Sequence, residues 1–169
     1  FVKDGLNLVA VEVYRYNAGS YLEDQDMWRL SGIFRNVTLW SSPQVHVRDF
    51  FVKPDLDAQY KDGKLTLEAK LKNFGDTPSA AGQLKAELYL PDGKLLDFAA
   101  ASVAIPALQP QEERTLSFSF AVSNPAKWTA ETPNLYTVVL SMNAGEHQEL
   151  LSTRIGFRKI EIKGRVFTI

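Results

Sequence analysis

The chain of 169 residues has no cysteine and only two histidines. Without cysteine it can form neither a disulfide framework nor a metal site with thiolate ligands. His46 and His147 lie far apart in the sequence, and neither has a second potential ligand at metal-binding spacing. We therefore expect both histidines to be ordinary surface or strand-end residues and predict no metal site around them.

The chain also lacks an excess of either charge and has no long hydrophobic run. Its 19 Lys and Arg residues nearly balance its 20 Asp and Glu residues. No nucleic-acid partner and no anionic membrane partner are therefore expected. No apolar run approaches the ~20 residues that a membrane-spanning helix needs, and no signal-like segment is present. The composition, 45% hydrophobic and 23% charged, is that of an ordinary globular protein.

A chain of this length can hold one domain, or one domain with pieces of its neighbours. The second arrangement fits better, because the chain starts in a strand-like run without an initiating Met. Residues 7–16 and 35–40 both alternate with period 2 and are predicted as strands whose faces are mostly apolar. Two strands and a loop cannot bury such faces, so we expect residues 1–42 to be the tail of a larger sandwich.

A regular series of short strands follows the boundary at residues 41–43, where a proline removes a backbone donor. The clearest alternation places Leu65, Leu67, Ala69 and Leu71 on one face. About seven strands without an amphipathic helix predict an all-β, immunoglobulin-like β-sandwich. Pro54 is expected to stop the first strand. The predicted strands are residues 45–53, 65–73, 83–90, 95–105, 114–122, 136–142 and 149–155.

Between the two N-terminal strands lies an acidic stretch without a regular period, residues 19–34. A long ordered loop of this kind is more often functional than not. Glu23, Asp24 and Asp26 are too close in sequence to flank a glycosidic bond as a catalytic carboxylate pair. Their oxygens can instead bind hard cations or sugar hydroxyls. The alternative for each is a solvated or ion-paired loop carboxylate.

Arginines and aromatic residues in the candidate motifs have structural readings as well. Arg29 and Arg35 could clamp a carboxylate substrate, but pairing with the acids of their own loop is favoured. Trp28 could stack on a sugar ring, but a role as the packing anchor of its loop is favoured. Trp128 and Tyr136 are interpreted as core and corner residues of the sandwich rather than as a binding motif.

Three stretches carry a resemblance to a known family. Residues 20–35, SYLEDQDMWRLSGIFR, closely resemble the signature that ends the sugar-binding domain of glycoside hydrolase family 2 β-galactosidases. Residues 128–136, WTAETPNLY, and residues 156–162, GFRKIEI, resemble the same family in the same order. The resemblance therefore covers essentially the whole chain.

The resemblance implies a division into three parts. Residues 1–42 would be the C-terminal part of a jelly-roll, galactose-binding-like domain, and residues 43–157 the whole immunoglobulin-like domain. Residues 158–169 would be the lead-in to a (β/α)8 catalytic barrel that this chain does not contain. The two catalytic glutamates of the family lie on barrel strands, so no catalytic residue is expected here and the chain alone should be inactive.

The resemblance also implies a role for the acidic loop in the parent enzyme. Such an enzyme hydrolyses terminal β-D-galactosides with retention, through a covalent intermediate. Asp26 falls on the Asp of the Gln-Asp-Met-Trp motif, which in the family ligates sodium and helps to position the galactose hydroxyls. Sodium and magnesium are expected for the parent, and neither is expected to bind this chain tightly. The expected partners are the β-galactoside, the remaining domains and further copies in a homo-oligomer.

An alternative is a stand-alone carbohydrate-binding or adhesive β-sandwich without enzymatic activity, because sandwiches host many functions. The exposed apolar surface distinguishes the two hypotheses, since a stand-alone module would not leave the strands at residues 7–16 and 35–40 bare. The sequence does not distinguish a bacterial cytoplasmic location from a periplasmic one.

Overall fold

The computed structural model describes residues 2–22 and 32–169. It divides into two compact units, Phe1–Trp40 and Ser41–Ile169, which are considered separately below. The acidic stretch from Glu23 to Ser31 lies outside the described residues. Within the described part of the chain, no helix is long and apolar enough to cross a membrane.

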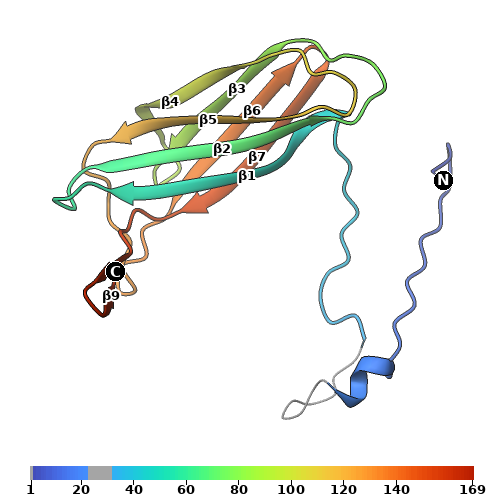
Figure 1. The fold of residues 1–169 in the computed structure, drawn as a ribbon, viewed down its shortest axis with the longest axis horizontal. Helices are drawn as coiled ribbons and strands as arrows, with labels where there is room; N and C mark the ends of the chain where they lie inside the picture. Colours follow the sequence, from blue (N-terminus) through green and yellow to red (C-terminus); the bar gives the residue numbers. More distant parts are fainter. Residues whose placement is uncertain (1, 23–31) are drawn as a thin grey trace. The chain divides into compact units, whose positions relative to one another are not determined.

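The larger unit is a β-sandwich of two antiparallel sheets (Figure 1). The prediction of an all-β, immunoglobulin-like sandwich is confirmed, with strand bounds close to those expected. One sheet has the order β1-β2-β5 and the other the order β4-β3-β6-β7. The strands are β1 (Val45–Leu56), β2 (Gly63–Asn73), β3 (Gly82–Tyr89), β4 (Leu95–Ile105), β5 (Glu113–Val122), β6 (Tyr136–Ala144) and β7 (His147–Ile155).

The fourth strand distinguishes this sandwich from the constant-type immunoglobulin arrangement, in which the fourth strand joins the sheet of the first two. Here β4 pairs with β3 along most of its length, from Gly82↔Ile105 to Tyr89↔Leu95. The turn Pro91–Lys94 joins the two strands as a hairpin, in which Leu90 N–H donates to the Lys94 carbonyl at 2.8 Å. A tight turn of this kind keeps consecutive strands in one sheet.

Alternation along β2 supplies the centre of the core. Leu65, Leu67, Ala69 and Leu71 are all fully buried, as predicted, and the residues between them are partly exposed. They pack against inward residues of the second sheet, including Leu84, Leu88, Val138 and Leu140. One buried face from each sheet is what makes the two layers adhere without a disulfide.

The prediction that Pro54 stops the first strand was wrong. Strand β1 continues to Leu56, with Pro54 paired with Leu65. The strand lies at the edge of its sheet, so Pro54 can direct its missing N–H away from the ladder. The register shifts at a bulge between Val47 and Asp49, and the N–H of Val47 donates to Glu149 Oε2 of β7 at 2.8 Å. This bond ties the edges of the two sheets together.

The strands predicted at residues 7–16 and 35–40 do not form in the described residues. Among its described residues, the N-terminal unit contains only the 3-10 helix η1 (Ala18–Tyr21), which Asn17 caps by accepting a hydrogen bond from Gly19 N at its side-chain oxygen, at 2.8 Å. A strand needs a hydrogen-bonded neighbour, and the described residues of this unit supply none. Its apolar side chains are exposed in consequence, among them Leu6, Leu8, Val9, Val11, Leu39 and Trp40.

The last residues form a small hairpin at one end of the sandwich (Figure 1). It consists of β8 (Glu161–Lys163) and β9 (Val166–Thr168), paired antiparallel. Gly164 takes a φ of 64°, a left-handed conformation that suits glycine in a two-residue hairpin turn. The hairpin alternates, so that Ile162 and Phe167 share one face while Glu161 and Thr168 share the other.

Truncation of Leu67 tests the core. Leu67→Ala should lower the free energy of unfolding by about 3 kcal/mol, because it removes buried apolar atoms and leaves a cavity between the sheets. The matched control is Leu150→Ala in β7, where the side chain is 75% exposed and the expected change is below about 0.5 kcal/mol. Urea denaturation followed by circular dichroism measures both. Equal losses in the two variants would contradict the assignment of the core.

Candidate functional site

The site residues predicted from the acidic loop cannot be placed. Glu23, Asp24, Asp26, Trp28 and Arg29 lie outside the described residues, so their roles stay predictions. Arg35 is described; it is exposed and its guanidinium lies 5.5 Å from the centre of the Phe34 ring. The predicted pairing of Arg35 with acids of the loop involves residues outside the described part and is not tested.

The two histidines occupy strand ends, as predicted. His46 follows the first residue of β1, where it is buried and stacks on Phe74 with ring centres 4.8 Å apart. His147 is the first residue of β7. Among residues 2–22 and 32–169, no group of three His, Cys, Asp or Glu side chains could hold a metal ion.

One cluster of described polar side chains lies where the sandwich meets the β8–β9 hairpin. The anchor of this region is Phe157, which is fully buried. Its ring meets that of Tyr136 edge to face, with centres 5.3 Å apart. The Tyr136 hydroxyl accepts a hydrogen bond from Ala126 N at 2.8 Å, so the predicted corner role of Tyr136 is confirmed.

Trp128 is not a core residue, contrary to the sequence interpretation. It is only partly buried, and the guanidinium of Arg158 lies 4.6 Å from the centre of its ring. The backbone N–H of Trp128 donates to the Phe157 carbonyl at 2.9 Å. Gly156 allows this close approach, because a Cβ at that position would lie 2.7 Å from the Cβ of Trp128. Trp128 is thereby held at the surface, beside the buried Phe157.

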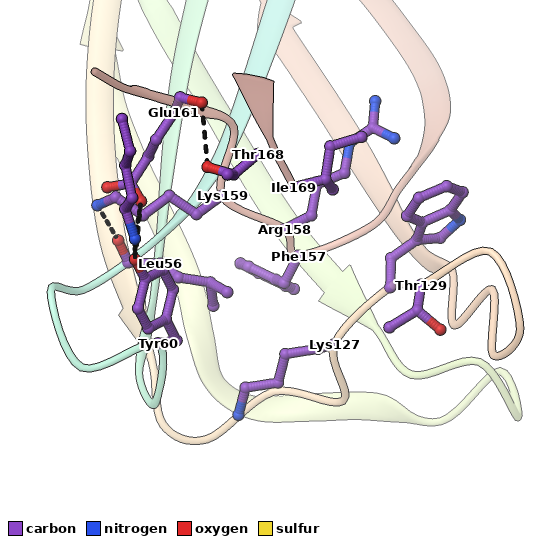
Figure 2. Close-up of a pocket in the computed structure, with 12 residues that line it drawn as sticks. Leu56, Tyr60, Lys127, Thr129, Phe157, Arg158, Lys159, Glu161, Thr168 and Ile169 are labelled. Atoms are coloured by element: carbon purple, nitrogen blue, oxygen red, sulfur yellow. Dashed lines mark hydrogen bonds and ion pairs between the residues drawn. The ribbon is translucent and has the colours of Figure 1, made fainter. Parts of the chain in front are cut away.

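A cavity of about 370 Å³ opens next to these residues (Figure 2). It lies between the turn after β1, the segment around Trp128 and the C-terminal hairpin. Its charged and aromatic lining comes from three separate parts of the chain. These lining residues are Tyr60, Lys127, Trp128, Phe157, Arg158, Lys159, Glu161 and Lys163.

Three of the lining side chains form a hydrogen-bonded cluster. The Tyr60 hydroxyl donates to Glu161 Oε2 at 2.7 Å and accepts from Lys163 Nζ. Lys163 Nζ also lies 3.1 Å from Glu161 Oε2. The hydrogen bond from Tyr60, and then the one from Lys163, lower the pKa of Glu161 below its ordinary value. The same cluster raises the pKa of Lys163, with the bond to Tyr60 as the largest cause.

The other cations around the cavity do not converge on a common point. Lys127 and Arg158 point to different sides of it (Figure 2). Lys127 Nζ donates to Asn124 Oδ1 at 2.7 Å, and Lys159 Nζ donates to the Leu56 carbonyl at 2.8 Å. Glu161 is the single carboxylate among the lining residues, whereas glycoside hydrolysis uses a pair. The cavity thus lies where the turn after β1 and the segment around Trp128 meet the C-terminal hairpin.

Two family models match this chain. Residues 1–43 match the model for the sugar-binding domain of glycosyl hydrolases family 2. Residues 45–158 match a second model of glycosyl hydrolases family 2. The chain belongs to glycosyl hydrolase family 2. The first match spans the N-terminal unit, and the second spans strands β1–β7 and ends before the β8–β9 hairpin.

Curated relatives in the family are β-galactosidases. The chain is 43% identical to a β-galactosidase from Priestia megaterium, over 100% of the chain and 16% of that protein. It is 42% identical to a β-galactosidase from Photobacterium profundum, over 96% of the chain and 16% of that protein. The chain therefore spans about one-sixth of the length of these relatives. These matches confirm the resemblance found in the sequence.

Solved structures of other glycosidases share the fold over about seven-tenths of this chain. A putative β-galactosidase from Bacteroides fragilis has a TM-score of 0.61 at 26% identity, covering 72% of this chain and 19% of that one. A β-glucuronidase from Bacteroides uniformis has a TM-score of 0.62 at 23% identity, covering 71% of this chain and 15% of that one. At that identity the second match supports the fold alone.

Acidification tests the cluster around Glu161. Because the folded-state pKa of Glu161 is lowered, its contribution to stability is present above the ordinary value of 4.5 and is lost as pH falls through the folded-state pKa. Between about pH 6 and about pH 3, unfolding free energy should fall less steeply in Glu161→Gln than in the wild type. Glu146→Gln is the control, since Glu146 has no ion pair or hydrogen bond with the described residues. Parallel pH profiles for wild type and Glu161→Gln would refute the pairing.

Proposed function

We propose that this chain is the non-catalytic middle portion of a retaining β-galactosidase that hydrolyses terminal β-D-galactosides. One observation carries the proposal: 43% identity with a β-galactosidase along the whole chain. Retaining hydrolysis needs two carboxyl groups about 5 Å apart across the glycosidic bond. The resemblance assigns that pair to the barrel, outside this chain.

The proposed role of the sandwich is that of a scaffold between domains. The outward face of the C-terminal hairpin supports this role, because Ile162 and Phe167 pair there and are 75% and 64% exposed. Adjacent exposed apolar side chains of this kind favour contact with another protein surface. The remaining domains of the parent are the proposed partners, and contacts between copies in a homo-oligomer belong to the same proposal.

The proposed role of the acidic loop is to contribute Asp26 to the active site. In this proposal Asp26 is a sodium ligand and helps to position the galactose hydroxyls, while the other ligands come from the barrel. Support comes from the sixteen-residue resemblance around Asp26 and from the preference of sodium and of sugar hydroxyls for oxygen partners. Magnesium is the second ion proposed for the parent enzyme, and neither ion is expected to bind this chain tightly by itself.

Substitution of Asp26 in the intact parent enzyme tests the role of the loop. Asp26→Asn and Asp26→Ala should reduce galactoside affinity at least about tenfold and weaken the dependence of the rate on sodium, because an oxygen ligand loses its charge or is removed. Asp24→Asn is the matched control two residues away and should behave like the wild type. Steady-state kinetics across a sodium titration measures all three. Wild-type kinetics in both Asp26 variants would remove Asp26 from the site.

Assay of the 169-residue chain by itself tests the placement of the catalytic groups. We expect no turnover of an aryl β-galactoside above a buffer blank, because the described residues offer no pair of carboxylates facing each other across the cavity. The intact parent, assayed in parallel, should release galactose whose first-formed anomer is β by proton NMR. Activity in the short chain, or an α-anomer from the parent, would overturn the proposal.

A further inference from the structure

The backbone of Tyr60 has an unusual conformation. Its φ is 55°, in the left-handed region that a bulky residue rarely adopts. The surrounding turn imposes it: Tyr60 N–H donates to the Asp57 carbonyl at 3.1 Å, and Asp57 Oδ1 accepts from Lys61 N at 2.8 Å. Glycine or asparagine would fit this position with less strain. A strained residue that persists in a tight turn points to a role for its side chain.

The side chain of Tyr60 reaches an element about 100 residues further along the chain. Its hydroxyl lies 2.7 Å from Glu161 Oε2 in β8, and Lys163 Nζ lies 5.0 Å from the centre of its ring. Figure 2 shows Tyr60 and Glu161 on the same side of the cavity, joined by the dashed bonds of this cluster. One tyrosine therefore uses its hydroxyl and its ring to hold two charged residues of the same strand.

The β8–β9 hairpin needs contacts outside itself to be stable. Its strands have three residues each, and an isolated two-stranded hairpin is at best marginally stable in water. Its apolar face is exposed, so burial of that face contributes little within this chain. Its inner face carries Glu161, Lys163 and Thr168, and the Thr168 hydroxyl donates to the Glu161 carbonyl at 3.1 Å within the hairpin. The polar bonds to Tyr60 connect β8 directly to the turn after β1.

We infer that Tyr60, Glu161 and Lys163 form a latch that fixes the β8–β9 hairpin to the turn between β1 and β2. Tyr60 is the positioning residue, and the left-handed backbone at Tyr60 aims its hydroxyl at the hairpin. The apolar pair Ile162 and Phe167 is held facing outward as a result. The latch concerns contacts within this chain and goes beyond the proposed enzymatic role, so it can be tested whether or not that role is correct.

Hydrogen exchange of the 169-residue chain tests the latch. Tyr60→Phe keeps the ring and removes only the hydroxyl, so amides of β8 and β9 should exchange about fivefold faster, while those of β2 and β6 keep their wild-type rates. Two-dimensional NMR should show the pKa of Glu161 rising toward its ordinary value in the same variant. Tyr89→Phe in β3 is the control, because the Tyr89 hydroxyl makes no hydrogen bond with the described residues.

A double-mutant comparison shows whether Tyr60 and Glu161 stabilise the hairpin through one shared interaction or through two independent contacts. Glu161→Gln weakens the same bond from the other side, so the double variant with Tyr60→Phe should exchange in the hairpin no more than about twice as fast as either single variant. Effects that multiply in the double variant would overturn the latch. So would unchanged hairpin exchange in Tyr60→Phe, or an equal acceleration of exchange in β2 and β6, which would indicate a general loss of stability.

Discussion

The burial of one apolar face from each of two sheets is the constraint on which the rest of the structure depends. Leu65, Leu67 and Leu71 of β2 have no access to solvent, and Leu84 and Leu140 meet them from the other sheet. The chain has no cysteine, so no disulfide can hold the layers together. Phe157 extends this core to the end of the sandwich, where Tyr136 closes it, and there the polar joint with the C-terminal hairpin begins.

The sandwich was predictable from the sequence because buried apolar residues and exposed residues alternate with period 2 along its strands. The alternation around Leu67 follows from the pairing of β2 with a strand on each side, so that its side chains face the core and the outer surface in turn. The corner role of Tyr136 was also predicted correctly, because a tyrosine at this kind of corner is a recurring feature of immunoglobulin-like sandwiches. The family was recognisable from three motifs, and the matches over residues 1–43 and 45–158 bear this out.

What the sequence did not predict depends on partners that are distant in the chain. Strand β1 continues through Pro54 because it lies at the edge of its sheet, where a missing N–H does not break the ladder. The order of strands in a sheet cannot be inferred from the residues around one proline. Residues 7–16 have a strand pattern but no described neighbour to pair with. The bond between Tyr60 and Glu161 joins residues 101 positions apart that share no motif, so no local pattern predicts it. Asp26 lies outside the described residues, so its site still depends on the resemblance.

The central claim is that residues 41–169 hold their fold through their own core, whereas the described residues of the unit Phe1–Trp40 form no strand. Limited trypsin digestion tests it directly, since Arg15 and Arg35 are exposed in the N-terminal unit. Mass spectrometry should show early cuts after these arginines and a resistant product that begins at Asn36 and contains β1–β7, whose melting temperature stays within about 2 °C of that of the uncut chain. Cleavage inside β1–β7 at the same rate, or loss of the melting transition after the first cuts, would contradict the account.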